Sequence, residues 1–162
     1  MPRPIAPMAP MPAKAAGVGR ATLYRRYPDP ATVAVALLDE HERDLQQRLL
    51  SGPPPLGPGA PPLQRLVAFY AAMVALLEQH LPLAETGSAR FAVGAYGFWR
   101  AHVRHLLDTA GIASSDGIVD VLLAPLAPEL YRYQRFERHQ SVDEIAEGLA
   151  WLARRVLAPD AG

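Results

Sequence analysis

Hydrophobic side chains recur every three or four residues along most of the chain after residue 29, which is the spacing of one helix face. This pattern predicts helices over 29–50, 62–80, 88–93, 96–110, 115–139 and 141–156. We expect Leu81-Pro82 to end the second of these helices, and Pro125 and Pro128 to kink or divide the fifth. No segment alternates as a β-strand does, so the predicted fold class is all-α.

The last predicted helix has the clearest sequence signals. Ser141 followed by Glu144 is a capping box, in which each side chain bonds the backbone N–H of the other residue. Arg154 and Arg155 stand in the last turn, where positive charge complements the helix dipole. We therefore expect a well-defined helix here.

Proline interrupts the helical pattern in two places. Residues 1–12 carry proline at positions 2, 4, 7, 10 and 12, which predicts an extended or disordered tail. Residues 51–62 contain six prolines and three glycines, which predicts a loop.

The stretch 15–27 has the pattern of the second half of a helix-turn-helix. Gly17 permits the positive φ that ends a helix, and Gly19 is an acceptable N-cap for the next one. Leu23 and Tyr27 lie four residues apart on one face of that short second helix. The opposite face carries Ala21, Thr22, Arg25 and Arg26. Such a helix has a narrow apolar stripe and a basic outer surface, as a DNA recognition helix requires.

The run Ala-Gly-Val-Gly-Arg-Ala-Thr-Leu-Tyr-Arg-Arg-Tyr-Pro-Asp at 16–29 resembles the helix-turn-helix signature of TetR-type transcriptional regulators. Those proteins are all-helical homodimeric repressors with a small N-terminal DNA-binding domain and a larger C-terminal domain that binds a small ligand. The resemblance is strong over 15–41 and beyond that rests on helix number and order. It implies base contacts around Arg20, Ala21 and Thr22, and contacts to the DNA backbone by Tyr24 and Arg26. Residue type suits Arg25 to phosphate contact as well.

The N-terminus departs from the family pattern. A TetR-type regulator has a full first helix where this chain has its proline-rich tail, and only 13–16 remain of the second helix. Pro30 also replaces a lysine that commonly contacts a phosphate. The predicted organisation is a reduced three-helix DNA-binding domain with its connecting helix (13–50), the loop 51–62, and a helical ligand-binding and dimerisation domain (63–162). A second hypothesis remains open, a ligand-binding or dimerising remnant that has lost specific DNA binding.

Charge is distributed unevenly along the chain. The formal net charge is zero, yet residues 1–28 contain no Asp or Glu and five Lys or Arg, so the rest must carry −5. Basic character is therefore confined to the end that holds the candidate recognition helix. The chain has no cysteine, no apolar run of 18 residues and no signal-peptide pattern, from which we expect a cytoplasmic protein.

Mixed aromatic and methionine side chains in the middle helices are candidates for an apolar ligand pocket. These residues are Tyr70, Met73, Phe91, Tyr96, Trp99 and His102. For each of these residues taken singly, packing in an ordinary helical core is the favoured interpretation. His102 and His105 lack a third ligand for a metal, no catalytic constellation is recognisable, and no cofactor is predicted. Predicted partners are operator DNA, an apolar or aromatic ligand, and a second copy docked through the two C-terminal helices, where Trp151 adds apolar surface.

Overall fold

The computed structural model describes residues 30–86, 95–113 and 116–158. Contacts divide the chain into two units, residues 1–36 and residues 37–162. Of the first unit only residues 30–36 are described, which form the opening turns of one helix. The buried core and its contacts belong to the second unit. Within the described residues every regular element is helical, which confirms the all-α prediction.

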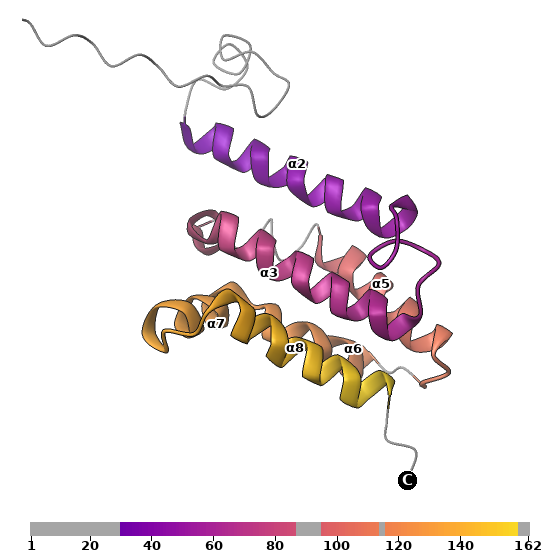
Figure 1. Cartoon of the computed structure of the whole chain (residues 1–162). Helices are drawn as coiled ribbons and strands as arrows, with labels where there is room; N and C mark the ends of the chain where they lie inside the picture. The colour runs from indigo at the N-terminus through magenta and orange to yellow at the C-terminus, as the bar shows by residue number, and fades with distance from the viewer. Residues whose placement is uncertain (1–29, 87–94, 114–115, 159–162) are drawn as a thin grey trace, which may run out of the picture. The chain divides into compact units, whose positions relative to one another are not determined.

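The elements follow one another as short and long helices joined by turns (Figure 1). They are α2 (Pro30–Ser51), α3 (Pro62–Thr86), α5 (Tyr96–Thr109), α6 (Asp116–Leu123), the 3₁₀ turn η1 (Ala124–Leu126), α7 (Pro128–Arg132), the π-helical turn η2 (Tyr133–Glu137) and α8 (Val142–Leu157).

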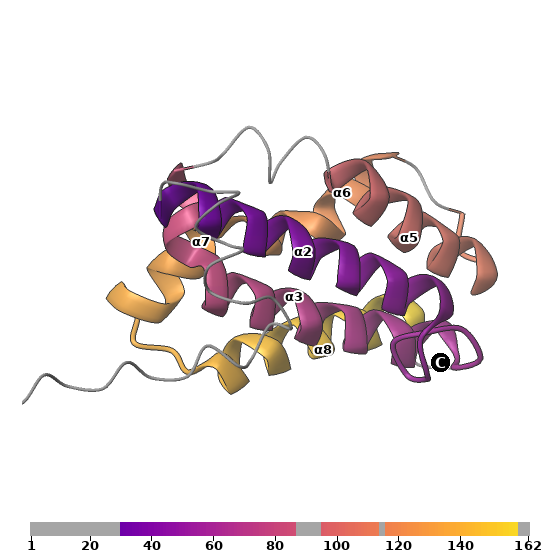
Figure 2. The same ribbon diagram turned by 90° about the horizontal axis from the view of Figure 1, so that it is seen from above.

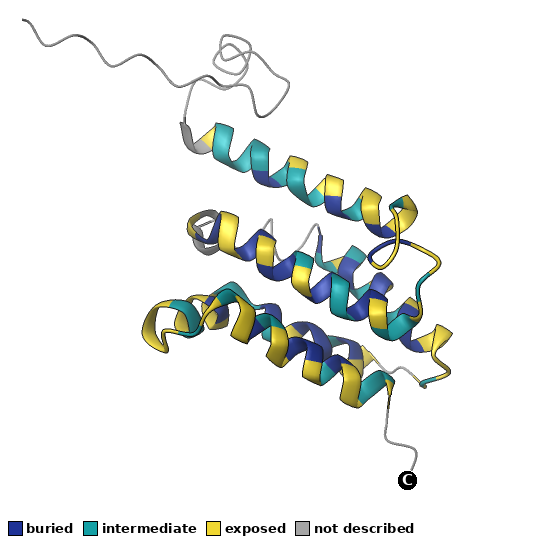
Figure 3. Ribbon diagram, in the orientation of Figure 1, coloured by how far each residue is buried: buried dark blue, intermediate teal, exposed yellow. Residues whose placement is uncertain are grey.

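Helix α3 lies at the centre of the second unit. It packs against α5, α7 and α8, and Figures 1 and 2 show it running alongside α8. Its buried apolar residues cover nearly half of the helix circumference: Leu66, Phe69, Tyr70, Met73, Val74, Leu76, Leu77 and Leu81. Figure 3 shows the resulting dark stripes along α3 and the more exposed outer surface of α8. A helix apolar on so much of its circumference is stable only when neighbours cover it.

The end of α2 is tied to the start of α3 by a buried arginine. Arg65 is only 8% exposed, and its Nη2 donates a hydrogen bond of 2.9 Å to the carbonyl of Leu49. Its Nε donates to the carbonyl of Leu56 in the intervening loop, at 3.4 Å. The same loop needs glycine at position 57, because a Cβ there would overlap the carbonyl oxygen of Gly52. The predicted loop thus has a defined path held by backbone acceptors.

One predicted helix end is wrong. The sequence predicts that Leu81-Pro82 stops the helix, yet α3 continues through Pro82 to Thr86. A proline inside a helix removes one N–H donor and crowds the carbonyl four residues earlier, but does not forbid the next turn. The preceding Leu81 is buried, so packing favours continuation of the helix.

The prolines of the C-terminal half act as predicted. Pro125 lies in η1, and Pro128 opens α7 at a position where no N–H donor is needed. The capping box is also confirmed: Ser141 Oγ accepts from Glu144 N at 3.1 Å, and Glu144 Oε2 accepts from Ser141 N at 2.7 Å. Helix α8 therefore begins at a defined residue.

A polar cluster joins α3 to α7 and η2. The Glu78 carboxylate accepts a hydrogen bond of 2.6 Å from the Tyr131 hydroxyl and two from the Arg135 guanidinium, at 2.7 and 3.0 Å. Arg135 also donates to the carbonyl of Gln140. These bonds to Arg135 and Tyr131 lower the pKa of Glu78 to about 2. The cluster holds the π-helical turn against the central helix.

We expect the substitution Tyr131→Phe to lower the free energy of unfolding by about 1–2 kcal/mol, because it removes a buried donor to a charged acceptor. Urea denaturation measures this directly. Tyr133→Phe on the same segment is the control, since Tyr133 is exposed and its change is expected to stay within about 0.5 kcal/mol. Equal effects of the two substitutions would contradict the assigned role of the cluster.

Candidate functional site

The candidate DNA-contacting residues lie outside the described residues. These are Arg20, Ala21, Thr22, Tyr24, Arg25 and Arg26. The description begins at Pro30, the first residue of α2, directly after the end of the signature run. Their interpretation as DNA contacts therefore still rests on the sequence.

Four of the six candidate pocket residues meet in one core between α3, α5 and α6. Tyr70 and Met73 are buried on α3, and Trp99 and His102 are buried on α5. Phe69 joins the two helices: its ring centroid lies 5.7 Å from that of Trp99 and 5.2 Å from that of His102. The apolar spacing places Phe69 only in a broad apolar arc, and a single sequence gives no signal that it contacts both aromatic side chains.

Among the described residues, two polar atoms of this core have no hydrogen-bond partner. They are the indole Nε1 of Trp99 and the Nε2 of His102, both buried. Burial, and then the positive charges of Arg65 and His105, lower the pKa of His102 to about 4. His102 is therefore neutral at pH 7. Unpaired buried donors and acceptors are uncommon in native cores, so this pair is the most unusual chemical feature there.

The remaining two candidates are placed differently. Tyr96 lies at the edge of the core and its hydroxyl donates a hydrogen bond of 3.0 Å to Asp120. By contrast, the buried Tyr70 hydroxyl donates to the carbonyl of Leu122, at 2.8 Å. Phe91 lies outside the described residues. The structure thus brings Tyr70, Met73, Trp99 and His102 together and places Tyr96 beside them.

A second set of polar groups lies where α2 meets α3. His41 Nδ1 and His80 Nε2 are 2.7 Å apart, and burial together with His41 lowers the pKa of His80. Nearby in sequence, Glu42 has a buried carboxylate oxygen without a hydrogen-bond partner. Burial, with the charge of Asp39, raises the pKa of Glu42 to about 7. The sequence does not single out this set, because pairing across 39 positions leaves no local pattern.

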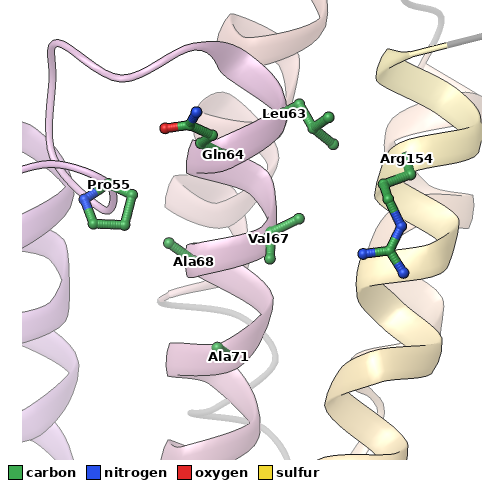
Figure 4. A pocket seen from close by; sticks show the side chains of 7 residues that line it. All are labelled: Pro55, Leu63, Gln64, Val67, Ala68, Ala71 and Arg154. Atoms are coloured by element: carbon green, nitrogen blue, oxygen red, sulfur yellow. The ribbon is translucent and has the colours of Figure 1, made fainter.

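Two grooves open on the surface of α3. One, of about 440 Å³, lies between the loop, α3 and α8, where Leu63 and Val67 face Arg154 (Figure 4). The other, of about 350 Å³, lies between α2 and α3 beside His41 and Leu76. None of the five candidate pocket residues that the structure describes lines either groove.

Exposed large apolar side chains occur on the C-terminal elements. They are Ile118, Val121, Leu130, Tyr133, Phe136 and Trp151. Trp151 on α8 is 56% exposed, with the guanidinium of Arg155 5.7 Å from its ring centroid. Clusters of exposed apolar side chains on a folded protein mark contact surfaces.

Two further findings concern only the described part of the chain. No helix there is long and apolar enough to cross a membrane. No group of three or more His, Asp or Glu side chains there is arranged to hold a metal ion.

The buried imidazole makes stability depend on pH. The pKa of His102 is about 4 in the fold and 6.5 in the unfolded chain, so the native state disfavours protonation. Its contribution is fully present above pH 6.5 and is lost as the pH falls towards 4, by at most about 3 kcal/mol. We expect His102→Leu to lose less stability than the wild type between pH 6.5 and 4, measured by urea denaturation across that range. The exposed His139, substituted by Asn, serves as control, because it is not among the groups that shift the pKa of His102 and Asn tolerates its positive φ. A pH dependence of His102→Leu identical to that of the wild type would contradict this account.

Comparison with known proteins identifies no relative: no family model, no curated protein and no solved structure matches the chain.

Proposed function

We propose that this chain is a TetR-like DNA-binding transcriptional regulator, a repressor that a small ligand releases from its operator. The observation that carries the proposal is the signature run at 16–29, which coincides with the basic end of the chain. A solvated surface helix also carries arginines, but it has no reason to keep this order of glycines, aromatics and proline around them.

The order of the described elements after the signature run supports this proposal. Helix α2 begins at Pro30, the residue that follows the signature run, and extends to Ser51. An all-helical unit follows it.

Release by a ligand requires polar anchors inside an apolar site. Trp99 Nε1 supplies a donor without a partner, and His102 Nε2 supplies a second buried atom in the same core. An apolar or aromatic ligand with one or two polar atoms would satisfy both. Because α2 contacts α3 through the His41–His80 pair, a ligand that alters the packing of α3 would also act on α2.

A homodimer is part of the proposal. Palindromic operators are read by two recognition helices related by a two-fold axis. The exposed apolar side chains of α7, η2 and α8 are the candidate contact surface, with Phe136 and Trp151 as the most exposed large apolar side chains on η2 and α8.

The alternative function is a ligand-binding or dimerising remnant without specific DNA affinity. The observation that favours it is the proline pattern of residues 1–12, which is incompatible with the helix that completes a helix-turn-helix core in the family. The recognition helix, at about eight residues, is too short to be stable alone, since roughly 12–15 residues are marginal. It would depend on Leu23 and Tyr27 for anchorage.

We expect the full chain to bind duplex DNA from its own promoter more tightly than a scrambled duplex, measured by fluorescence anisotropy at several salt concentrations. Arg26→Ala should weaken binding and reduce the slope of log affinity against log salt by about one unit, because one phosphate contact is lost. The matched control is Arg48→Ala, an exposed arginine on α2 that pairs with Asp44 and lies outside the signature run.

Equal affinity for promoter and scrambled duplexes would reject the regulator and favour the remnant. An unchanged salt slope in Arg26→Ala would reject the contact assigned to that residue.

A further inference from the structure

The outer face of α8 carries four exposed residues in one stripe, Glu144, Gly148, Trp151 and Arg155. At 3.6 residues per turn, these positions fall within about a sixth of the helix circumference. The buried residues Ile145, Leu149 and Ala153 lie on the opposite side, against the core. The stripe therefore points away from the unit to which α8 belongs.

The middle of the stripe has features that a solvated helix does not need. Gly148 is in mid-helix, where glycine costs about 1 kcal/mol relative to alanine, and a Cβ there would meet nothing within 4 Å. Three residues on, Trp151 is 56% exposed. The stripe thus has a large exposed indole next to a residue without a side chain, where another helix can approach closely.

The charges along α8 would attract those of a second copy of α8 that runs in the opposite direction. Its first half carries Asp143, Glu144 and Glu147, and its second half carries Arg154 and Arg155. Two copies side by side in the same direction would place like charges together. Two antiparallel copies place the acidic half of each against the basic half of the other.

We propose that α8 pairs antiparallel with α8 of a second copy of this chain, about a two-fold axis between positions 149 and 150. In this register Trp151 of each copy lies over Gly148 of the other, and Glu144 lies opposite Arg155. Each indole then lies over a residue without a side chain, and opposite charges face each other along the pair. The inference rests on the proposed homodimer and adds its register and contact residues.

One helix pair buries less surface than the roughly 1,200 Å² of a stable interface, so this contact is the centre of a larger one. The segment directly before α8 supplies further exposed apolar side chains, Leu130, Tyr133 and Phe136.

The absence of cysteine makes the register directly testable by disulfide cross-linking of single-cysteine variants. In Gly148→Cys the two sulfurs are offset by three residues along the helices, about 4.5 Å, whereas in Glu144→Cys the offset is eleven residues, about 16 Å. A disulfide requires Cα atoms within about 7 Å. Under mild oxidation we expect at least about tenfold more linked dimer from Gly148→Cys than from Glu144→Cys. An equimolar mixture of Glu144→Cys and Arg155→Cys chains should form the mixed dimer.

Several outcomes overturn the register. Gly148→Cys that stays monomeric excludes α8 from the contact, and equally fast linkage of Glu144→Cys alone indicates parallel helices. Circular dichroism of each reduced variant distinguishes a lost contact from a lost fold. If Gly148→Cys cross-links but the chain has no DNA affinity, the regulator is rejected and this inference stands. If the chain binds its DNA but Gly148→Cys does not cross-link, the regulator stands and this inference is rejected.

Discussion

Burial of α3 is the constraint on which the rest of the described structure depends. Buried apolar residues cover nearly half of the circumference of this helix, and it becomes stable only when α5, α7 and α8 pack around it. Phe69 is fully buried where α3 meets α5 and contacts the rings of Tyr70, Trp99 and His102. Removing such a side chain from a core typically costs about 3–5 kcal/mol. The polar contacts of Arg65 and Glu78 then fix how α3 meets its neighbours at its two ends.

Helix positions were largely predictable because their signals are local. Apolar spacing indicated α2, α3, α5 and α8, and the Ser141–Glu144 capping box marked the start of α8. Pro128 opened a helix as its fixed φ favours. The prediction that proline ends a helix failed at Pro82, where the packing of α3 outweighed the loss of one backbone hydrogen bond.

The candidate site was less predictable, because its distinguishing features depend on contacts between distant residues. Residue type suggested Trp99 and His102, but their unpaired buried nitrogens result from how α5 lies on Phe69. The His41–His80 pair and the raised pKa of Glu42 need the packing of α2 on α3. The residues proposed to contact DNA lie outside the described part of the chain, so for them the sequence signature is still the argument.

The proposals assign separate tasks to separate parts of the chain. The basic end would contact DNA, the core between α3 and α5 would hold a ligand, and the outer face of α8 would join two copies. Uneven charge is the feature common to both ends: positive charge without acids in residues 1–28, and opposite charges at the two ends of α8. The positive charge of residues 1–28 favours binding to a polyanion. The opposite charges at the two ends of α8 favour pairing with α8 of a second copy.

Selection of bound fragments from a random duplex library tests the central claim most directly, because it requires specific DNA binding and two-fold symmetry in the same molecule. The account predicts that the full chain enriches a palindromic sequence whose half-sites are separated by one helical turn or a multiple of it. No enriched motif, or a single half-site without its inverted partner, would contradict a dimeric DNA-binding regulator.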